Sequence, residues 1–304
     1  MKTKPTVLYD VPGPRARRRN VLWTLLFLVA LAAVVWWVVA SLADKGQLEW
    51  SKWAPFFTDA RVWETYILPA LKNTVIAAGL AMVIALPLGA LLGISRLSDH
   101  RAVRGTAGTV VEFFRAIPVL ILMLFANEAY SEFIDISPDV RPLYAVVTGL
   151  VLYNASVLAE VVRAGILALP AGQTDAAKAI GMRKGQTMTY VLLPQSVTAM
   201  LPALVSQLVV IVKDTALGGA MLGFSELLAS VRPMSANYGA NTIACFTVVA
   251  VLFVILNFAL TTFASWLEGR LRRGKKSTGA VVGVGAVEEL ATPGEHMGPT
   301  DETK

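Results

Sequence analysis

Opposite charges lie three residues apart inside two long apolar stretches of this chain. Glu112 and Arg115 form one pair, and Glu160 and Arg163 form the other. Residues three apart share one face of a helix, so the members of each pair could interact. A charge at membrane depth is costly and usually faces the protein interior or a water-filled cavity. These residue types therefore indicate ion pairs between packed helices or near the membrane surface, contacts to a polar solute, or a gate.

Other polar residues interrupt the apolar stretches as well. Lys213 and Asp214 are adjacent, so they point to different sides of a helix and need different partners. Asn154 is a candidate for lining a pathway, because a buried amide needs hydrogen-bond partners. Asn127 and Glu128 are expected to be solvated near an outer end.

No set of residues predicts catalysis or a bound cofactor. Gly269–Lys276 reads G-x-x-x-x-G-K-K, but Lys276 stands where a phosphate-binding loop needs Ser or Thr. His100 and His296 lack ligand-like neighbours, and the single cysteine, Cys245, cannot form an internal disulfide. We therefore expect a chain that is not an enzyme and binds no metal. The energy for any transport must come from another chain or from an ion gradient.

A polar stretch between two apolar runs has the pattern of a surface helix–turn–helix. Thr174 can cap a short helix, and alanines at 176, 177 and 179 favour that helix and leave a smooth surface. Gly181 permits a sharp turn, and Pro194 marks the return to the membrane. Such an element could dock into a groove on another protein, although a plain amphipathic loop fits the same residues.

The elements that position these residues must be membrane helices. The chain has 304 residues, of which 55% are hydrophobic and 16% charged, where soluble domains average about a quarter charged. The mean hydropathy is +0.60, which argues against a soluble enzyme. The net charge is +6, but the basic residues lie beside apolar runs, so they indicate anionic lipid and cytoplasmic loops rather than nucleic acid.

A spanning helix needs about 20 apolar residues, and six stretches qualify. They are Val21–Leu42, Asn73–Ile94, Thr109–Tyr130 with Pro118 inside it, Leu143–Leu169, Val197–Leu217 and Asn241–Leu267. The basic clusters then fall on one side, which places both termini in the cytoplasm. Gly89 and Gly93 lie on one face of the second span and permit close helix packing.

The predicted organisation has five parts. A basic cytoplasmic N-terminus (1–20) precedes the first transmembrane helix (21–42), an aromatic outer segment (43–70), a core (71–267) containing a cytoplasmic loop (170–195), and a basic, then disordered tail (268–304). The first helix is either a retained anchor or a signal peptide cleaved near Ser41-Leu42-Ala43, and its length favours the anchor. A short helix is expected around residues 225–231.

The polar loop resembles the signature of ABC-importer membrane subunits, which reads E-A-A, then Gly four positions after the second Ala, then a hydrophobic residue and Leu-Pro. The residues at that spacing are Asp175, Ala176, Ala177, Gly181, Val191, Leu193 and Pro194. Asp175 replaces the usual Glu and keeps its charge on a shorter side chain. Further stretches resemble the polar amino-acid branch of that family: EFFRAIP at 112–118, YNASVLAEVVRAG at 153–165 and KDTAL at 213–217.

The resemblance, which covers about 71–267, implies an all-α polytopic membrane protein of the type I importer fold, with one N-terminal helix added to a five-helix core. It implies a second permease subunit, two ATP-binding subunits that hold ATP and magnesium, and an extracytoplasmic substrate-binding protein, in a bacterial inner membrane. It places ATPase coupling on Asp175, Ala176, Ala177, Gly181 and Pro194, and offers as substrate-pathway or gating residues Glu112, Arg115, Asn154, Glu160, Arg163, Lys213, Asp214 and Thr215. The implied substrate is a polar amino acid, with glutamate or glutamine first.

A secondary transporter of a small polar solute, driven by an ion gradient, is the alternative. Glu160 or Asp214 would then hold a proton or sodium ion, because intramembrane carboxylates serve that purpose in such proteins. The missing inverted repeat and the docking loop argue against this alternative.

Overall fold

The computed structural model describes residues 13–273, and every regular element in that range is helical. Five helices are long and apolar enough to cross a membrane: Pro14–Asp44, Val62–Ser95, Arg141–Leu167, Lys184–Leu222 and Thr242–Arg270. They correspond to five of the six predicted spans. Residues 1–12 of the predicted basic N-terminus (1–20) and residues 274–304 of the predicted basic, then disordered tail (268–304) lie outside the described residues.

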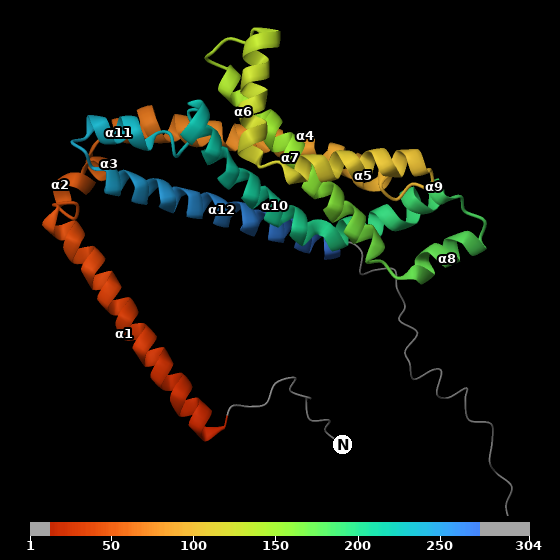
Figure 1. The fold of residues 1–304 in the computed structure, drawn as a ribbon, viewed down its shortest axis with the longest axis horizontal. Helices are drawn as coiled ribbons and strands as arrows, with labels where there is room; N and C mark the ends of the chain where they lie inside the picture. The colour runs from red at the N-terminus through yellow and green to blue at the C-terminus, as the bar shows by residue number, and fades with distance from the viewer. Residues whose placement is uncertain (1–12, 274–304) are drawn as a thin grey trace, which may run out of the picture.

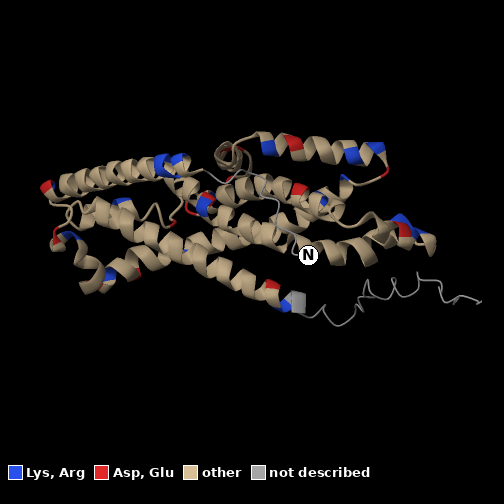
Figure 2. Cartoon of the chain, turned by 90° about the horizontal axis from the view of Figure 1, so that it is seen from below, with Lys and Arg blue, Asp and Glu red and all other residues tan. Residues whose placement is uncertain are grey.

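Helix α1 (Pro14–Asp44) stands apart from the other helices (Figure 1). It contains no buried residue, although its apolar stretch includes Trp23, Trp36 and Trp37. The charged residues of α1 lie near the two ends of this helix (Figure 2). A long apolar helix that is exposed on all sides suits a lipid environment.

The close pairing of α4 (Leu68–Ser95) with α7 (Arg141–Leu167) forms the centre of the bundle. A Cβ atom on Gly89 would lie 2.7 Å from Cβ of Leu158, and one on Gly93 would lie 2.6 Å from the carbonyl oxygen of Ala159. Only glycine allows the two backbones to approach so closely. The predicted close packing at these two glycines is confirmed.

The third predicted span is wrong as a single helix. The chain forms α5 (Arg101–Ala116) and α6 (Val119–Ala129), with a π-helical end at Tyr130–Ile134, and the two parts are bent by 98° (Figure 1). Pro118 explains the break, because a proline forces the residue before it out of the helical region. Ile117 accordingly has φ −90° and ψ 129°.

After α7 the chain forms the short helix α8 (Ala171–Ala179) and then one continuous helix. That helix comprises α9 (Lys184–Gln186), a π-helical turn η3 (Thr187–Leu192) and α10 (Leu193–Leu222). The expected separate re-entry at Pro194 is therefore wrong: the proline lies inside this continuous helix, two residues after the π-helical turn ends at Leu192.

The end of the bundle opposite α8 carries short helices. These are α2 (Trp50–Trp53), α3 (Pro55–Thr58) and α11 (Val231–Asn237), with a π-helical turn η1 (Val62–Ile67) that leads into α4 (Figure 1). The short helix expected at 225–231 is wrong, because a turn occupies residues 227–230 and α11 starts at Val231. Helix α12 (Thr242–Arg273) ends the described chain.

Candidate functional site

Helix α8 presents the motif residues on an exposed face. Asp175 and Ala176 are exposed, whereas the side of α8 that carries Ala177 is packed inward, with Ala177 only 4% exposed. Gln195 of α10 donates a hydrogen bond to the side chain of Gln173 at 3.2 Å, which fixes α8 to the following helix. Ile180, which follows α8, is 78% exposed and adds an apolar side chain to this surface. The arrangement is a small, rigid, partly apolar surface suited to a groove on another protein.

The turn after α8 depends on Gly181. The Gly181 N–H donates to the carbonyl of Lys178 at 2.9 Å, and the Met182 N–H donates to that of Ala177 at 3.0 Å. This is the Schellman pattern of helix ends, in which the residue after the cap is left-handed. Gly181 has φ +80°, so the predicted sharp turn is confirmed. The predicted cap at Thr174 is wrong, since α8 begins three residues earlier at Ala171.

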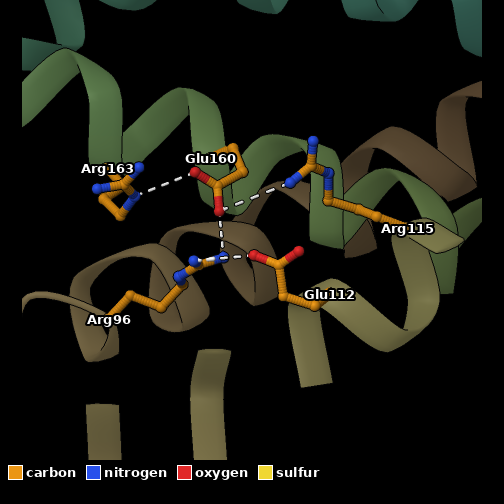
Figure 3. A network of polar contacts seen from close by, with 5 residues as sticks. All are labelled: Arg96, Glu112, Arg115, Glu160 and Arg163. Atoms are coloured by element: carbon orange, nitrogen blue, oxygen red, sulfur yellow. Dashed lines mark hydrogen bonds and ion pairs between the residues drawn. The ribbon is translucent and has the colours of Figure 1, made fainter. Parts of the chain in front are cut away.

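Glu160 of α7 is the centre of a charge network near the α8 end of the bundle (Figure 3). Its carboxylate accepts a hydrogen bond from Arg163 at 3.0 Å and another from Arg96, at the end of α4. Arg115 of α5 lies 3.8 Å from the same carboxylate. Arg96 also donates to Glu112 of α5 at 3.1 Å. One carboxylate thus joins α4, α5 and α7.

The structure brings four predicted residues together but changes their pairing. The Glu160–Arg163 pair is present, whereas Glu112 and Arg115 each pair with a residue of another helix. The sequence analysis did not single out Arg96. Its position directly after an apolar helix was a signal that it could fold back along that helix. Three arginines around two glutamates leave this end of the bundle positively charged.

Asn154 of α7 pairs with Gln207 of α10. The Asn154 side chain is fully buried, donates to the carbonyl of Leu150 at 2.7 Å and accepts a hydrogen bond from the Gln207 amide. Gln207 was missed in the sequence, although a lone amide in an apolar span was itself a signal. The pair links α7 to α10 through a side-chain hydrogen bond.

Replacing Asn154 with leucine is expected to destabilise the protein by about 1 kcal/mol, because the Gln207 amide loses its acceptor. The double variant Asn154→Leu/Gln207→Leu is expected to recover part of that loss, since no polar group then lacks a partner. Thermal unfolding of the purified protein in detergent measures both effects. A double variant less stable than Asn154→Leu would contradict the pairing.

Lys213, Asp214 and Thr215 do not join the charge network. They lie on α10 in its half toward α11, six to eight residues beyond Gln207, or about 9–12 Å along the helix axis. Lys213 is exposed beside a groove that Phe246 and Phe253 of α12 also line. Thr215 is buried and donates to the carbonyl of Val212 at 2.7 Å. The candidate pathway residues therefore occupy three separate levels.

Glu226, between α10 and α11, is a buried carboxylate that the sequence analysis did not single out. It is fully buried, and its oxygens accept the N–H groups of Leu228 and Ala229, each at 2.7 Å. Thr74 of α4 accepts the N–H of Leu227 at 3.1 Å and holds the same turn. Burial raises the pKa of the Glu226 carboxyl above its ordinary value.

The raised pKa predicts that Glu226 makes the protein less stable as the pH rises. Near pH 4.5, its ordinary pKa, the folded state binds more protons than the unfolded state. The contribution of Glu226 is thus greatest at low pH and is lost as the pH rises through the folded-state pKa. We expect the melting temperature of Glu226→Gln, relative to the natural protein, to be higher at pH 7.5 than at pH 5. A difference that does not change with pH would contradict this prediction.

In residues 13–273 no group of three or more His, Cys, Asp or Glu side chains could hold a metal ion. This end of the bundle combines the exposed short helix α8, the start of the continuous α9–α10 helix, and the ion pairs that join α4, α5 and α7.

Comparison with known proteins agrees with these features. The family of binding-protein-dependent transport system inner membrane components matches residues 85–273. The chain is 44% identical to the glutamate transport system permease protein GluD of Corynebacterium glutamicum, over 77% of this chain and 85% of that protein. It is 27% identical to the inner membrane amino-acid ABC transporter permease protein YhdY of Escherichia coli, over 86% of this chain and 67% of that protein.

A solved structure has the same fold. The crystal structure of an amino acid ABC transporter with histidines matches with a TM-score of 0.59 and 25% sequence identity, over 67% of this chain and 92% of that chain. This match leaves a part of the chain uncovered. That part is longer than helix α1 and the segment up to α4 taken together.

Proposed function

The chain belongs to the family of binding-protein-dependent transport system inner membrane components, and we propose that it is the membrane-spanning subunit of an ATP-driven importer of glutamate or glutamine. It is a multi-pass permease of the bacterial inner membrane. Its relatives are permease subunits, which are not themselves enzymes.

The exposed helix α8 carries the proposal of ATP coupling. Asp175, Ala176 and Gly181 stand at the spacing of the importer signature, on the exposed side of a short helix that ends in a rigid turn. We assign two ATP-binding subunits to this surface and its counterpart on a second permease subunit. ATP and magnesium would be bound and consumed there, and this chain would bind neither. The basic residues at these helix ends support a cytoplasmic location for this face and for both termini.

The mechanism we propose is alternating access. Closure of the ATP-binding subunits moves α8 and, through the turn that follows it, α9. Pro194 and the rest of α10 follow, because α9, η3 and α10 form one helix. The charge network around Glu160 keeps α4, α5 and α7 together at that end, so the bundle moves as a unit rather than helix by helix. The half of α10 toward α11 carries Lys213, Asp214 and Thr215. At this position they could line the substrate pathway.

The 44% identity to a glutamate permease over most of both chains supports glutamate or glutamine as substrate. A separate extracytoplasmic binding protein would deliver the amino acid and set much of the selectivity. In the proposed orientation, α11 and the short helices at the same end of the bundle would face that protein.

Purification of the tagged chain from its own host in mild detergent tests the proposed assembly. We expect an ATP-binding subunit to co-purify with the natural chain and to be reduced with Asp175→Arg, which reverses an exposed charge on α8 without changing a buried contact. Lys45→Glu, which reverses a charge at the far end of α1, is the matched control. Failure to recover any ATP-binding subunit, even after crosslinking, would contradict the proposal.

A further inference from the structure

The five-residue loop between α4 and α5 receives contacts from both sides. On one side, Arg96 donates to Glu160 of α7 and to Glu112 of α5 (Figure 3). On the other side, the Lys184 ammonium donates to the carbonyl of Leu97 at 2.8 Å and to the Asp99 carboxylate at 2.5 Å. The charge network and α9 are therefore joined through a few residues of one loop.

Lys184 is the first residue of α9, three residues after the Gly181 turn that ends α8. A movement of α8 would therefore reach Lys184 directly. One contact of its ammonium is to a backbone carbonyl, so it holds the path of the loop and not only a side chain. Arg104 of α5 stiffens the same loop by donating to the carbonyl of Ser98 at 2.8 Å.

The contact is too exposed to matter much for stability. The side chains of Lys184 and Asp99 are 52% and 78% exposed, and ion pairs of that kind contribute about 0–1 kcal/mol. The contact still favours the charged form of Asp99, because the hydrogen bond from Lys184 holds the pKa of the Asp99 carboxyl below its ordinary value. Lys184 lines two surface pockets, one together with His100 and the other together with Lys178.

We propose that Lys184 is a positioning residue that ties the α8–α9 segment to the α4–α5 loop, so that docking movements reach α4, α5 and α7 as well as α10. This proposal rests on the proposed function. The α8–α9 segment would then transmit movement by two routes. One is the continuous α9–α10 helix, and the other is the α4–α5 loop that carries Arg96. Without Lys184 only the first would remain, and ATP hydrolysis would drive less transport.

The test compares uptake per ATP hydrolysed in the complete importer reconstituted in liposomes. We expect Lys184→Ala to keep the ATP-binding subunit and a basal ATPase rate within about twofold of the natural protein, but to lower uptake per ATP by about fivefold, the equivalent of roughly 1 kcal/mol. Lys184→Arg should restore most of the ratio, because arginine can reach the same two acceptors. Lys45→Ala, which removes an exposed lysine at the end of α1 away from the proposed docking surface, is the matched control and should leave the ratio unchanged.

Two results would overturn the proposal: a ratio for Lys184→Ala equal to that of the natural protein, or an equal fall in Lys45→Ala. A merely structural role for Lys184 would lower uptake and ATPase activity together and would also overturn it. Failure of the proposed function looks different, because the natural complex would then show no ATP-dependent uptake at all.

Discussion

Replacement of Gly181 with valine is expected to lower uptake by about tenfold or more, because a left-handed conformation costs a non-glycine residue about 1–3 kcal/mol. Gly181 has φ +80°, a value at which a β-branched residue is a strong outlier. A Cβ atom at this position would meet nothing within 4 Å, so the cost comes from the backbone and not from crowding. The chain would relieve it by opening the turn and displacing α8 relative to α9.

Gly181→Asn is the matched control, because asparagine tolerates the left-handed region better than other residues with a side chain. It should keep most of the uptake, with Gly181→Ala in between. Uptake by cells, corrected for the amount of chain in the membrane, measures the series. Equal uptake by the valine and asparagine variants would show that the turn geometry does not serve coupling.

Replacement of Glu160 with alanine is expected to lower uptake strongly and stability moderately. The change removes the carboxylate that Arg96, Arg115 and Arg163 share. Removing one partner of a fully buried ion pair costs about 3–5 kcal/mol, and the 21% exposure of Glu160 reduces that to about 2 kcal/mol. Since the arginines come from three elements, their repulsion separates α4, α5 and α7 at one end.

Glu112→Gln is the control for this second prediction. Glu112 is 65% exposed and contacts only Arg96 of the network, so its loss should change uptake by less than about twofold. Glu160→Gln should behave like Glu160→Ala, because an amide keeps the size but loses the charge. Uptake and thermal unfolding of the four proteins separate transport from stability. Near-normal uptake by Glu160→Ala would show that transport does not need the charge network around Glu160.

The features that depend on local sequence could be predicted. Apolar length identified five spans, because a membrane imposes a fixed length on a helix. Glycine spacing identified the close contact of α4 with α7, and the Gly181 turn followed from the absence of a side chain. The loop motif indicated the family, which the comparisons confirm.

The features that depend on tertiary contacts were missed or misassigned. The partners of Glu112 and Arg115 were wrong, because helical spacing favours neighbours on one helix while the fold offers Arg96 and Glu160 from others. The 98° break at Pro118 could have been predicted, since a proline limits the residue before it, but the surrounding apolar run suggested a continuous span. Gln207 is recognisable as a lone amide in an apolar span, but its partner Asn154, like the backbone partners of Glu226, follows only from the fold.

ATP-driven uptake of labelled glutamate into proteoliposomes tests the central claim most directly. The sample contains this chain, its co-purifying subunits and the binding protein, oriented so that the ATP-binding subunits face the side that receives Mg-ATP. The account predicts accumulation that starts only with ATP, resists an uncoupler and is competed by excess unlabelled glutamate or glutamine. Accumulation that needs no ATP and collapses with the ion gradient would contradict it and would identify a secondary transporter instead.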